Sequence, residues 1–126
     1  LTGQAVCGIL FTGEVKTPWH FQRRYRMEVV FRSRKMQKQY EDHRKAEKAY
    51  GAEVARRYVE RVNIIRHARD IEELRRLPGL RCHPLKGNRE GEWAMNLTGF
   101  YRLLFSLEGE RLEIVCIEEV SKHYGD

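Results

Sequence analysis

Apolar and polar residues alternate with the two-residue period of β-strands through the last third of the chain. Residues 92–97 and 101–107 carry large apolar side chains at every second position, which predicts strands with one buried face. Residues 112–120 are almost continuously apolar, as expected of a central strand covered on both faces. Turn residues at 98–99 and 108–109 separate these segments, so we expect an antiparallel meander.

A helical period precedes the meander. Residues 33–50 and 52–69 have apolar side chains at steps of three and four, which predicts two amphipathic helices. Only Gly51 separates them, and a connection this short favours an antiparallel helical hairpin. Asp70 is a suitable N-cap for a third, short helix over residues 71–77.

Charged residues are frequent on the predicted helices, with basic and acidic types interspersed. This composition is typical of a solvated face with ion pairs between residues four apart. The charged residues of the second helix that we expect to face water are Glu53, Arg56, Arg57, Glu60 and Arg61.

These elements place the protein in the α+β class, with a small antiparallel sheet packed against an N-terminal helical hairpin. Helices on one face of the sheet would leave the other face available for a partner. The 126 residues suffice for a single domain. A strand pattern at residues 29–31 follows Met27 closely, so we expect the domain to span residues 27–126, with residues 1–26 an N-terminal extension of unclear role.

The formal net charge of +6 and a sequence pI near 9.4 favour an anionic partner. No apolar run approaches the length that spans a bilayer, and we expect a cytoplasmic protein. Three cysteines without a C-x-x-C pair indicate reduced thiols rather than a disulfide framework or a zinc site. Cys116 is expected to be buried, and Cys82 to point away from its neighbour His83.

The segment 81–87 combines an imidazole and an ammonium group, His83 and Lys86, in a predicted hairpin. Alternate hairpins of a meander lie at one end of the sheet, where Arg102 and the C-terminal Lys122-His123-Tyr124 could join them. This set lacks the carboxylate pairs and ligand spacing of a metal site, and we expect no metal and no cofactor. It contains the proton-transfer groups and cations that metal-free RNA cleavage requires.

Four segments together give the sequence a specific likeness. They are Leu77-Pro78-Gly79, His83-Pro84-Leu85-Lys86-Gly87-Asn88-Arg89, Tyr101-Arg102-Leu103-Leu104-Phe105 and Ile117-Glu118-Glu119-Val120-Ser121-Lys122-His123-Tyr124. On these residues the chain from Met27 onward resembles type II toxins of the RelE superfamily, in particular the HigB branch.

The resemblance implies an endoribonuclease that enters the ribosomal A site and cuts bound mRNA. It also implies a cognate helix-turn-helix antitoxin. The histidine and lysine that are functional in HigB-like toxins correspond to His83 and Lys86, and the arginine that would contact the reacting phosphate corresponds to Arg102.

The C-terminus departs from the HigB pattern, in which an Asp-Tyr-His type ending contributes catalytic groups. Lys122-His123-Tyr124 stands there instead, so the general base is left open between His83 and His123. Tyr124 would stack on a base or orient the substrate, and Lys122, Arg81 and Arg89 are predicted to bind RNA.

Two other functions and a plain structural interpretation compete with this assignment. A toxin of the same fold could inhibit a protein such as DNA gyrase, as in the ParE branch, without cutting RNA. A non-catalytic RNA-binding module is the other possibility. Structurally, Lys86 could merely solvate a hairpin, Arg102 could pair with Glu92 across the sheet, and His123 and Tyr124 could form a plain surface terminus.

Overall fold

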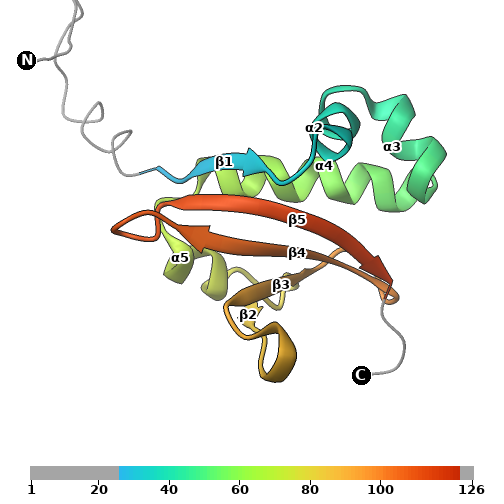
Figure 1. The fold of residues 1–126 in the computed structure, drawn as a ribbon. Coiled ribbons are helices and arrows are strands. Elements are labelled where there is room, and N and C mark those ends of the chain that lie inside the picture. Colours follow the sequence, from blue (N-terminus) through green and yellow to red (C-terminus); the bar gives the residue numbers. More distant parts are fainter. Residues whose placement is uncertain (1–25, 123–126) are drawn as a thin grey trace, which may run out of the picture.

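A five-stranded sheet runs through residues 26–122, the part of the chain that the computed structural model describes. The strands are β1 (Glu28–Phe31), β2 (His83–Pro84), β3 (Glu92–Asn96), β4 (Tyr101–Glu108) and β5 (Ile114–Lys122). Their order across the sheet is β1-β5-β4-β3-β2, which makes β4 the central strand (Figure 1).

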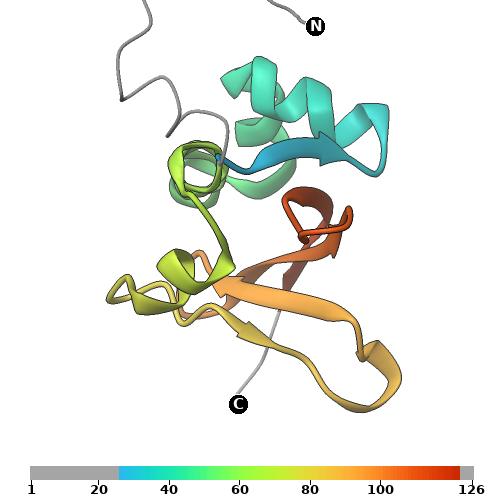
Figure 2. The same cartoon turned by 90° about the vertical axis from the view of Figure 1, so that its left-hand side faces the viewer.

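Four helices and one 3₁₀ turn complete the described fold. They are α2 (Arg34–Glu41), α3 (His43–Tyr50), α4 (Ala52–His67), α5 (Ile71–Arg76) and η1 (Gly87–Arg89). Both α4 and α5 lie against one face of the sheet, and no helix of the described chain covers the other face (Figures 1 and 2). The predicted α+β class is confirmed.

One edge of the sheet differs from the antiparallel arrangement that the sequence predicts. Strands β2 to β5 pair antiparallel in order, but β1 pairs with β5 in parallel, with Val29 opposite Val115 and Phe31 opposite Ile117. A parallel pair needs a long crossover connection, and the helices between β1 and the meander provide it. The local residue pattern of residues 29–31 cannot distinguish the two directions.

The predicted first helix is interrupted at Asp42, so its continuity is a wrong prediction. Asp42 has extended backbone (φ −127°, ψ 103°) and its side chain accepts a hydrogen bond from the Arg44 N–H. An aspartate side chain competes with the helical backbone and favours an N-cap, which ends α2 and starts α3 at this residue. Ser33 and Asp70 cap α2 and α5 in the same way.

The core lies between α4 and the sheet. Tyr58 and Ile65 of α4 are fully buried, as are Phe105 of β4 and Ile117 of β5. Trp93 of β3 stacks on Phe105 with 6.4 Å between ring centroids, which extends the core towards the edge of the sheet. Burial of this many large side chains supplies the main driving force for folding.

Two arginines of α4 tie that helix to the β3–β4 hairpin. Arg61 is only 7% exposed, and its Nε donates to the Asn96 carbonyl at 3.0 Å. Arg57 donates to the Leu97 carbonyl at 3.2 Å. The expectation that Arg61 faces water is therefore wrong, because the helix turns this residue towards backbone carbonyls that need donors. Burial lowers the pKa of Arg61 from its ordinary value.

Strand β5 also departs from the prediction, because it is not covered on both faces. It starts at Ile114, two residues later than expected, since Leu112 lies in the preceding turn with φ 55° and is 48% exposed. A β-bulge in the pairing with β4 falls at Glu118, the residue between the partners of Phe105 and Leu104. Its carboxylate and that of Glu119 both lie on the side away from α4.

The hydroxyl of Tyr58 offers a test of the core. It is buried and donates to the Met36 carbonyl of α2 at 2.8 Å, which joins α4 to α2. Tyr58→Phe removes this hydrogen bond, and we expect a loss of about 0.5–1.5 kcal/mol in the free energy of unfolding, measured by urea denaturation. Tyr101→Phe, which removes a hydroxyl with no hydrogen bond to the described chain, should change stability by less than about 0.5 kcal/mol.

Candidate active site on the open face of the sheet

The side of the sheet opposite α4 and α5 is called the open face here. Strand register places His83, Ala94, Leu104 and Glu119 in one row across β2, β3, β4 and β5. The next row contains Asn96, Arg102 and Ser121. Neighbouring strands are about 4.8 Å apart and residues of a strand rise about 3.3 Å each, so the backbone positions of His83 and Arg102 are about 12 Å apart, within reach of one extended ligand.

The ring of His83 is held in a defined orientation by the residue two positions before it. Its Nδ1 lies 2.7 Å from the Arg81 carbonyl, which can only accept, so Nδ1 carries the hydrogen of the neutral ring. The other nitrogen, Nε2, then has a lone pair available to take a proton. Arg81 adopts left-handed backbone (φ 48°), a strained conformation for arginine that directs this carbonyl.

Arg102 has an unusual environment on β4. Its Nε is buried and has no hydrogen-bond partner among residues 26–122. It does not pair with Glu92, because that residue lies opposite Ser106 and forms an ion pair with Arg89 instead. A buried donor without a partner costs free energy, and an acceptor that reached this atom would remove that cost. The predicted role of Arg102 at the phosphate stays a prediction.

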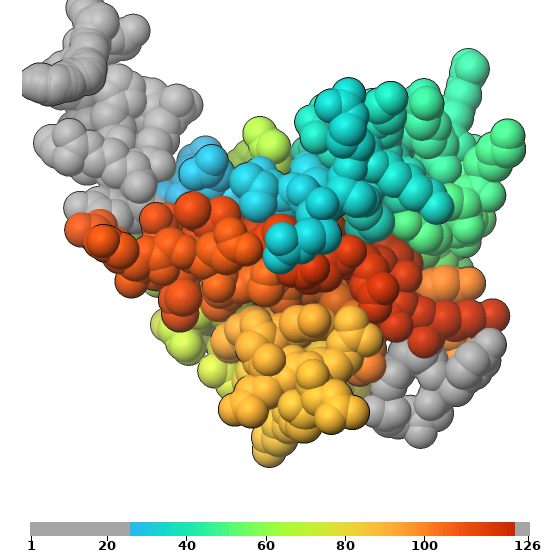
Figure 3. Space-filling model, in the orientation of Figure 1, coloured from blue at the N-terminus to red at the C-terminus, as the bar shows by residue number. Residues whose placement is uncertain are grey.

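Arg89 lies across the centre of the open face. Its guanidinium contacts Glu92 of β3 at 3.0 Å and Glu119 of β5 at 3.1 Å, so it spans β4 from one side to the other. The segment around η1 is thereby fastened against the sheet, as the golden-yellow atoms of Figure 3 show. The hydrogen bond with Glu92 raises the pKa of Arg89. Two carboxylates compensate its charge, which leaves less of it for an RNA phosphate. Its role in RNA binding stays a prediction.

Glu119 is a residue of this face that the sequence analysis did not select. It shares a row with His83 and adds a carboxylate to a region expected to be purely cationic. The signal was a pair of adjacent glutamates within an otherwise apolar strand. Charged residues in such a strand indicate an exposed face.

Lys86 follows β2 and is the N-cap residue of η1. It is exposed and makes no hydrogen bond or ion pair with the rest of the described chain. In an extended strand, residues three apart have their Cβ atoms on opposite faces, so the side chains of Lys86 and His83 leave the backbone on opposite sides. Because β2 is the last strand of the sheet, a long lysine side chain can reach round its edge to either face.

The remaining predicted site residues lie at the end of β5 or beyond it. Lys122 is opposite Tyr101, and its Nζ lies 5.8 Å from the centre of that ring, on the side of the sheet away from Arg102. His123 and Tyr124 are outside the described residues. Their roles therefore stay predictions.

A second polar cluster lies on the open face near β1. Arg32 forms a two-pronged ion pair with Glu118, with Nε–Oε1 and Nη2–Oε2 distances of 3.1 and 2.9 Å. The Ser106 hydroxyl donates to the same carboxylate at 2.7 Å. The Arg32 hydrogen bond, reinforced by that of Ser106, lowers the pKa of Glu118 although partial burial opposes the shift. This cluster joins β1, β4 and β5 and has no free group for a reaction.

The two cysteines in the described region are buried, as expected for structural thiols. Burial raises the pKa of Cys82 to about 11, so this thiol is not a nucleophile at neutral pH. Residues 26–122 contain no group of three histidine, cysteine, aspartate or glutamate side chains arranged to hold a metal ion. None of the helices in this range is long and apolar enough to cross a membrane.

Solved structures of other proteins share this fold. The chain resembles a histidine-to-glutamine mutant of YafQ from E. coli, with a TM-score of 0.52 and 16% identity over 79% of this chain and 100% of that one. The YoeB-YefM complex from Staphylococcus aureus gives a TM-score of 0.51 and 14% identity, over 79% and 99% of the two chains. A YoeB/ParE toxin from Agrobacterium tumefaciens is 22% identical with a TM-score of 0.48, over 78% and 100%. The first two likenesses, with TM-scores above 0.5, show that the chain has the fold of these toxins.

The family follows from sequence. A family model described as HigB-like toxin, the RelE-like toxin of the type II toxin-antitoxin system HigB, matches residues 29–117. The chain therefore belongs to the HigB-like toxin family, and it is a type II toxin, as its sequence motifs suggest. None of the curated proteins compared with the chain matches it.

The lowered pKa of Glu118 predicts a pH dependence of stability. A carboxylate whose pKa is depressed by folding stabilises the protein above its unfolded pKa, about 4.3, and this contribution is lost as the pH falls through the folded value. We expect Glu118→Gln to lower the urea midpoint at pH 7, with a gap to the unsubstituted protein that shrinks steadily below about pH 4. Exposed Glu110, changed to Gln as the control, should give no such gap. A gap independent of pH would contradict the assignment.

Proposed function

We propose that the chain is a ribosome-dependent endoribonuclease that cuts translated mRNA by metal-free acid-base transphosphorylation. The observation that supports this most strongly is the buried, unpartnered Nε of Arg102, one row from the imidazole of His83 on the open face. A fixed cation and a proton acceptor within reach of one phosphodiester suit this reaction.

In the proposed reaction a base removes the proton from the ribose 2′-hydroxyl, and the 2′-oxygen attacks the adjacent phosphorus. The bond from phosphorus to the 5′-oxygen breaks, and an acid protonates the departing oxygen. The products are a 2′,3′-cyclic phosphate and a 5′-hydroxyl, so no external reactant is needed. His83 and His123 are the candidate proton-transfer groups, and the free Nε2 of His83 fits the role of base.

Cations stabilise the charge that develops on the phosphate. Arg102 has a planar fork of donors that matches two phosphate oxygens, and Lys86 would add a mobile ammonium from the η1 segment. Tyr124 would stack on a base or orient it. Such a modest set of groups is sufficient if the ribosome holds the 2′-hydroxyl in line with the phosphate.

The proposal includes the cellular setting. Residues 27–126 form the toxin domain, in the cytoplasm where mRNA is translated, and residues 1–26 are an extension. The S. aureus relative is a complex of YoeB with YefM. By analogy we propose a cognate antitoxin of the helix-turn-helix type for this chain.

Arg102→Lys tests the phosphate contact while it retains the positive charge. Loss of the guanidinium fork should reduce cleavage of ribosome-bound mRNA by at least about 100-fold. The measurement is the appearance of new 5′ ends, mapped across the transcripts of induced cells. Arg66→Lys on the exposed surface of α4 is the matched control and should leave cleavage unchanged. Growth arrest with intact mRNA and inhibited DNA gyrase would overturn the nuclease in favour of a ParE-like inhibitor.

His83→Gln and His123→Gln decide between the two candidate bases. We expect the His83 change to reduce the single-turnover cleavage rate by about 10²–10⁴-fold and the His123 change to have the smaller effect, because the contact of His83 Nδ1 with the Arg81 carbonyl leaves its Nε2 to accept a proton. Antitoxin binding, measured in parallel, should be unchanged in both. The reverse order of the two losses would assign the base to the C-terminus.

A further inference from the structure

Arg102 and Glu119 lie close together on the open face, yet they form no ion pair. Arg102 is opposite Ser121 and Glu119 is opposite Leu104, so Arg102 and Glu119 are diagonal neighbours on β4 and β5. Diagonal neighbours in an antiparallel pair are about 7–8 Å apart, a distance that an arginine and a glutamate side chain can bridge. The Nε of Arg102 is nevertheless without a partner among residues 26–122, and this lack of pairing needs a cause.

Glu119 is the carboxylate best placed to reach Arg102. Within the row of Arg102 and the neighbouring row, Glu119 is the only acidic residue of the described strands. Glu92 is one row further away, opposite Ser106, and is bound to Arg89. A guanidinium with an unsatisfied donor and a carboxylate within reach normally pair, because hydrogen bonds between charged groups are strong. A further contact must therefore hold Glu119 away.

That contact is made by Arg89. Its Nη2 donates to Oε2 of Glu119 at 3.1 Å, while its Nε donates to Oε1 of Glu92 at 3.0 Å. The guanidinium is planar and its donors point in fixed directions, so the contact with Glu92 orients the donor that faces Glu119. Because Glu92 lies opposite Ser106, the bridge draws the Glu119 carboxylate towards that part of β4 and away from Arg102.

The bridge lies over an apolar patch of the open face. Ala94 and Leu104 point to this face and are not part of the core under α4, but they are only 1% and 0% exposed. Contact with apolar groups on one side reduces the screening of the bridge by water. The side chains of Arg89 and Glu119 are still about half exposed, and such a pair adds little stability. The consequence of the bridge is therefore where it holds the carboxylate.

We propose that Arg89 is a positioning residue, which holds Glu119 away from Arg102 and thereby keeps the Arg102 guanidinium free for a phosphate of the RNA. The proposal deepens the proposed function and rests on the role that Arg102 has there. It gives Arg89 an indirect role in place of the direct contact with RNA that the sequence analysis predicts. It also explains why a buried donor stays unpaired beside a carboxylate.

Arg89→Gln tests this arrangement independently of any activity. Loss of the guanidinium releases Glu119, which should then accept a hydrogen bond from the Arg102 Nε. In the ¹⁵N–¹H NMR spectrum of the arginine side chains, the Arg102 Nε–H signal should move downfield, and Arg102→Lys identifies that signal by removing it. Arg89→Gln combined with Glu119→Gln should return the signal to its original position. A signal that stays unchanged in Arg89→Gln would overturn the proposal.

A second measurement concerns the phosphate. The probe is a fluorescein-labelled single-stranded oligodeoxynucleotide of about 10 nucleotides, which has no 2′-hydroxyl and cannot be cut by the proposed reaction. Fluorescence anisotropy with the full chain at about 0.1 M salt gives Kd. Arg89→Gln should weaken binding about tenfold, because Glu119 then competes with the phosphate for Arg102. Arg89→Gln with Glu119→Gln should restore Kd to within about threefold, and Glu119→Gln alone should not weaken binding.

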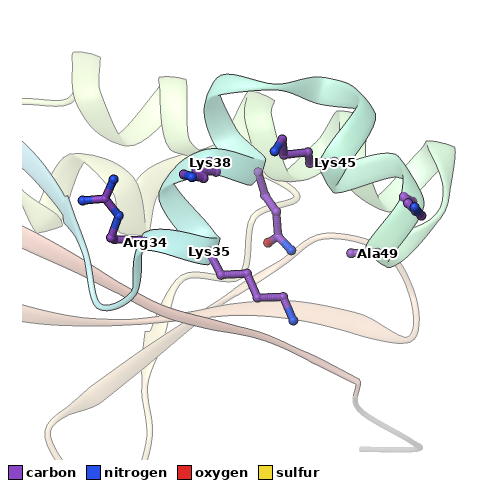
Figure 4. Close-up of a pocket in the computed structure, with 7 residues that line it drawn as sticks. Arg34, Lys35, Lys38, Lys45 and Ala49 are labelled. Carbon is purple, nitrogen blue, oxygen red and sulfur yellow. The ribbon is translucent and has the colours of Figure 1, made fainter.

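Two controls separate this effect from a change in net charge. Arg89→Gln with Glu110→Gln has the same net charge as the restoring variant, but it removes an exposed acid from the turn between β4 and β5, and it should bind as weakly as Arg89→Gln. Lys45→Gln removes one cation from α3, beside the hollow between α2 and α3 (Figure 4), and should change Kd by less than about twofold. Circular dichroism checks that every variant is folded.

Other roles of Arg89 predict other orders of affinity. If Arg89 contacts the phosphate itself, removal of Glu119 will not restore binding, and that result would overturn the proposal. If the bridge only fastens the η1 segment, Glu119→Gln will weaken binding as much as Arg89→Gln, which would overturn it as well. Binding that does not depend on Arg102 would contradict the proposed function at this residue, and the NMR signal would still decide separately whether Arg89 holds Glu119 away.

Discussion

The two-residue alternation of the central strand β4 is the constraint on which the rest of the structure depends. Leu103 and Phe105 point to the core under α4, while Arg102, Leu104 and Ser106 must then point to the open face. A shift of one residue would place a guanidinium in the core under α4 and move two large apolar side chains out of it. The register that protects the core therefore also fixes where the arginine of the candidate site lies, and no separate device is needed to place it.

Much of this architecture can be predicted from sequence because it follows from local periods and turn residues. The N-cap at Asp70, the β3–β4 hairpin and the burial of Cys116 all have such local causes. What the sequence could not show depends on partners far away in the chain. The direction of β1 is decided by the free edge of β5, and the burial of Arg61 by backbone carbonyls of β3 that lie opposite it. The helix break at Asp42 had a local signal, which the apolar period on both sides of it obscured.

The residues of the candidate site can also be separated into those with a local sequence signal and those whose place depends on distant partners. His83 and Arg102 could be selected by residue type, but their place on one face depends on pairing across three strands. Glu119 and the bridge that Arg89 makes to it could not be predicted, because the contact joins η1 to β5 over the width of β4. This bridge changes the electrostatics of the face: one arginine is compensated by carboxylates, and the neighbouring Arg102 is left with an unsatisfied donor. Arg89 and Arg102 are the same residue type on the same face, and the difference in how their charge is compensated comes from tertiary contacts alone.

The distribution of charge over the whole domain follows from these contacts. Some cations are held by carboxylates and contribute to the fold, as in the pairs of Arg32 with Glu118 and Arg75 with Glu72. Other cations of residues 26–122, among them Lys86 and Arg102 of the open face and the lysines of α2 and α3, form no ion pair with a described residue. Local concentration matters physically, because the field of clustered charges at a surface decays within about 8–10 Å in physiological salt. An anion therefore meets the positive charge of this protein at particular surfaces, and a basic pI alone would not have distinguished them from the rest of the molecule.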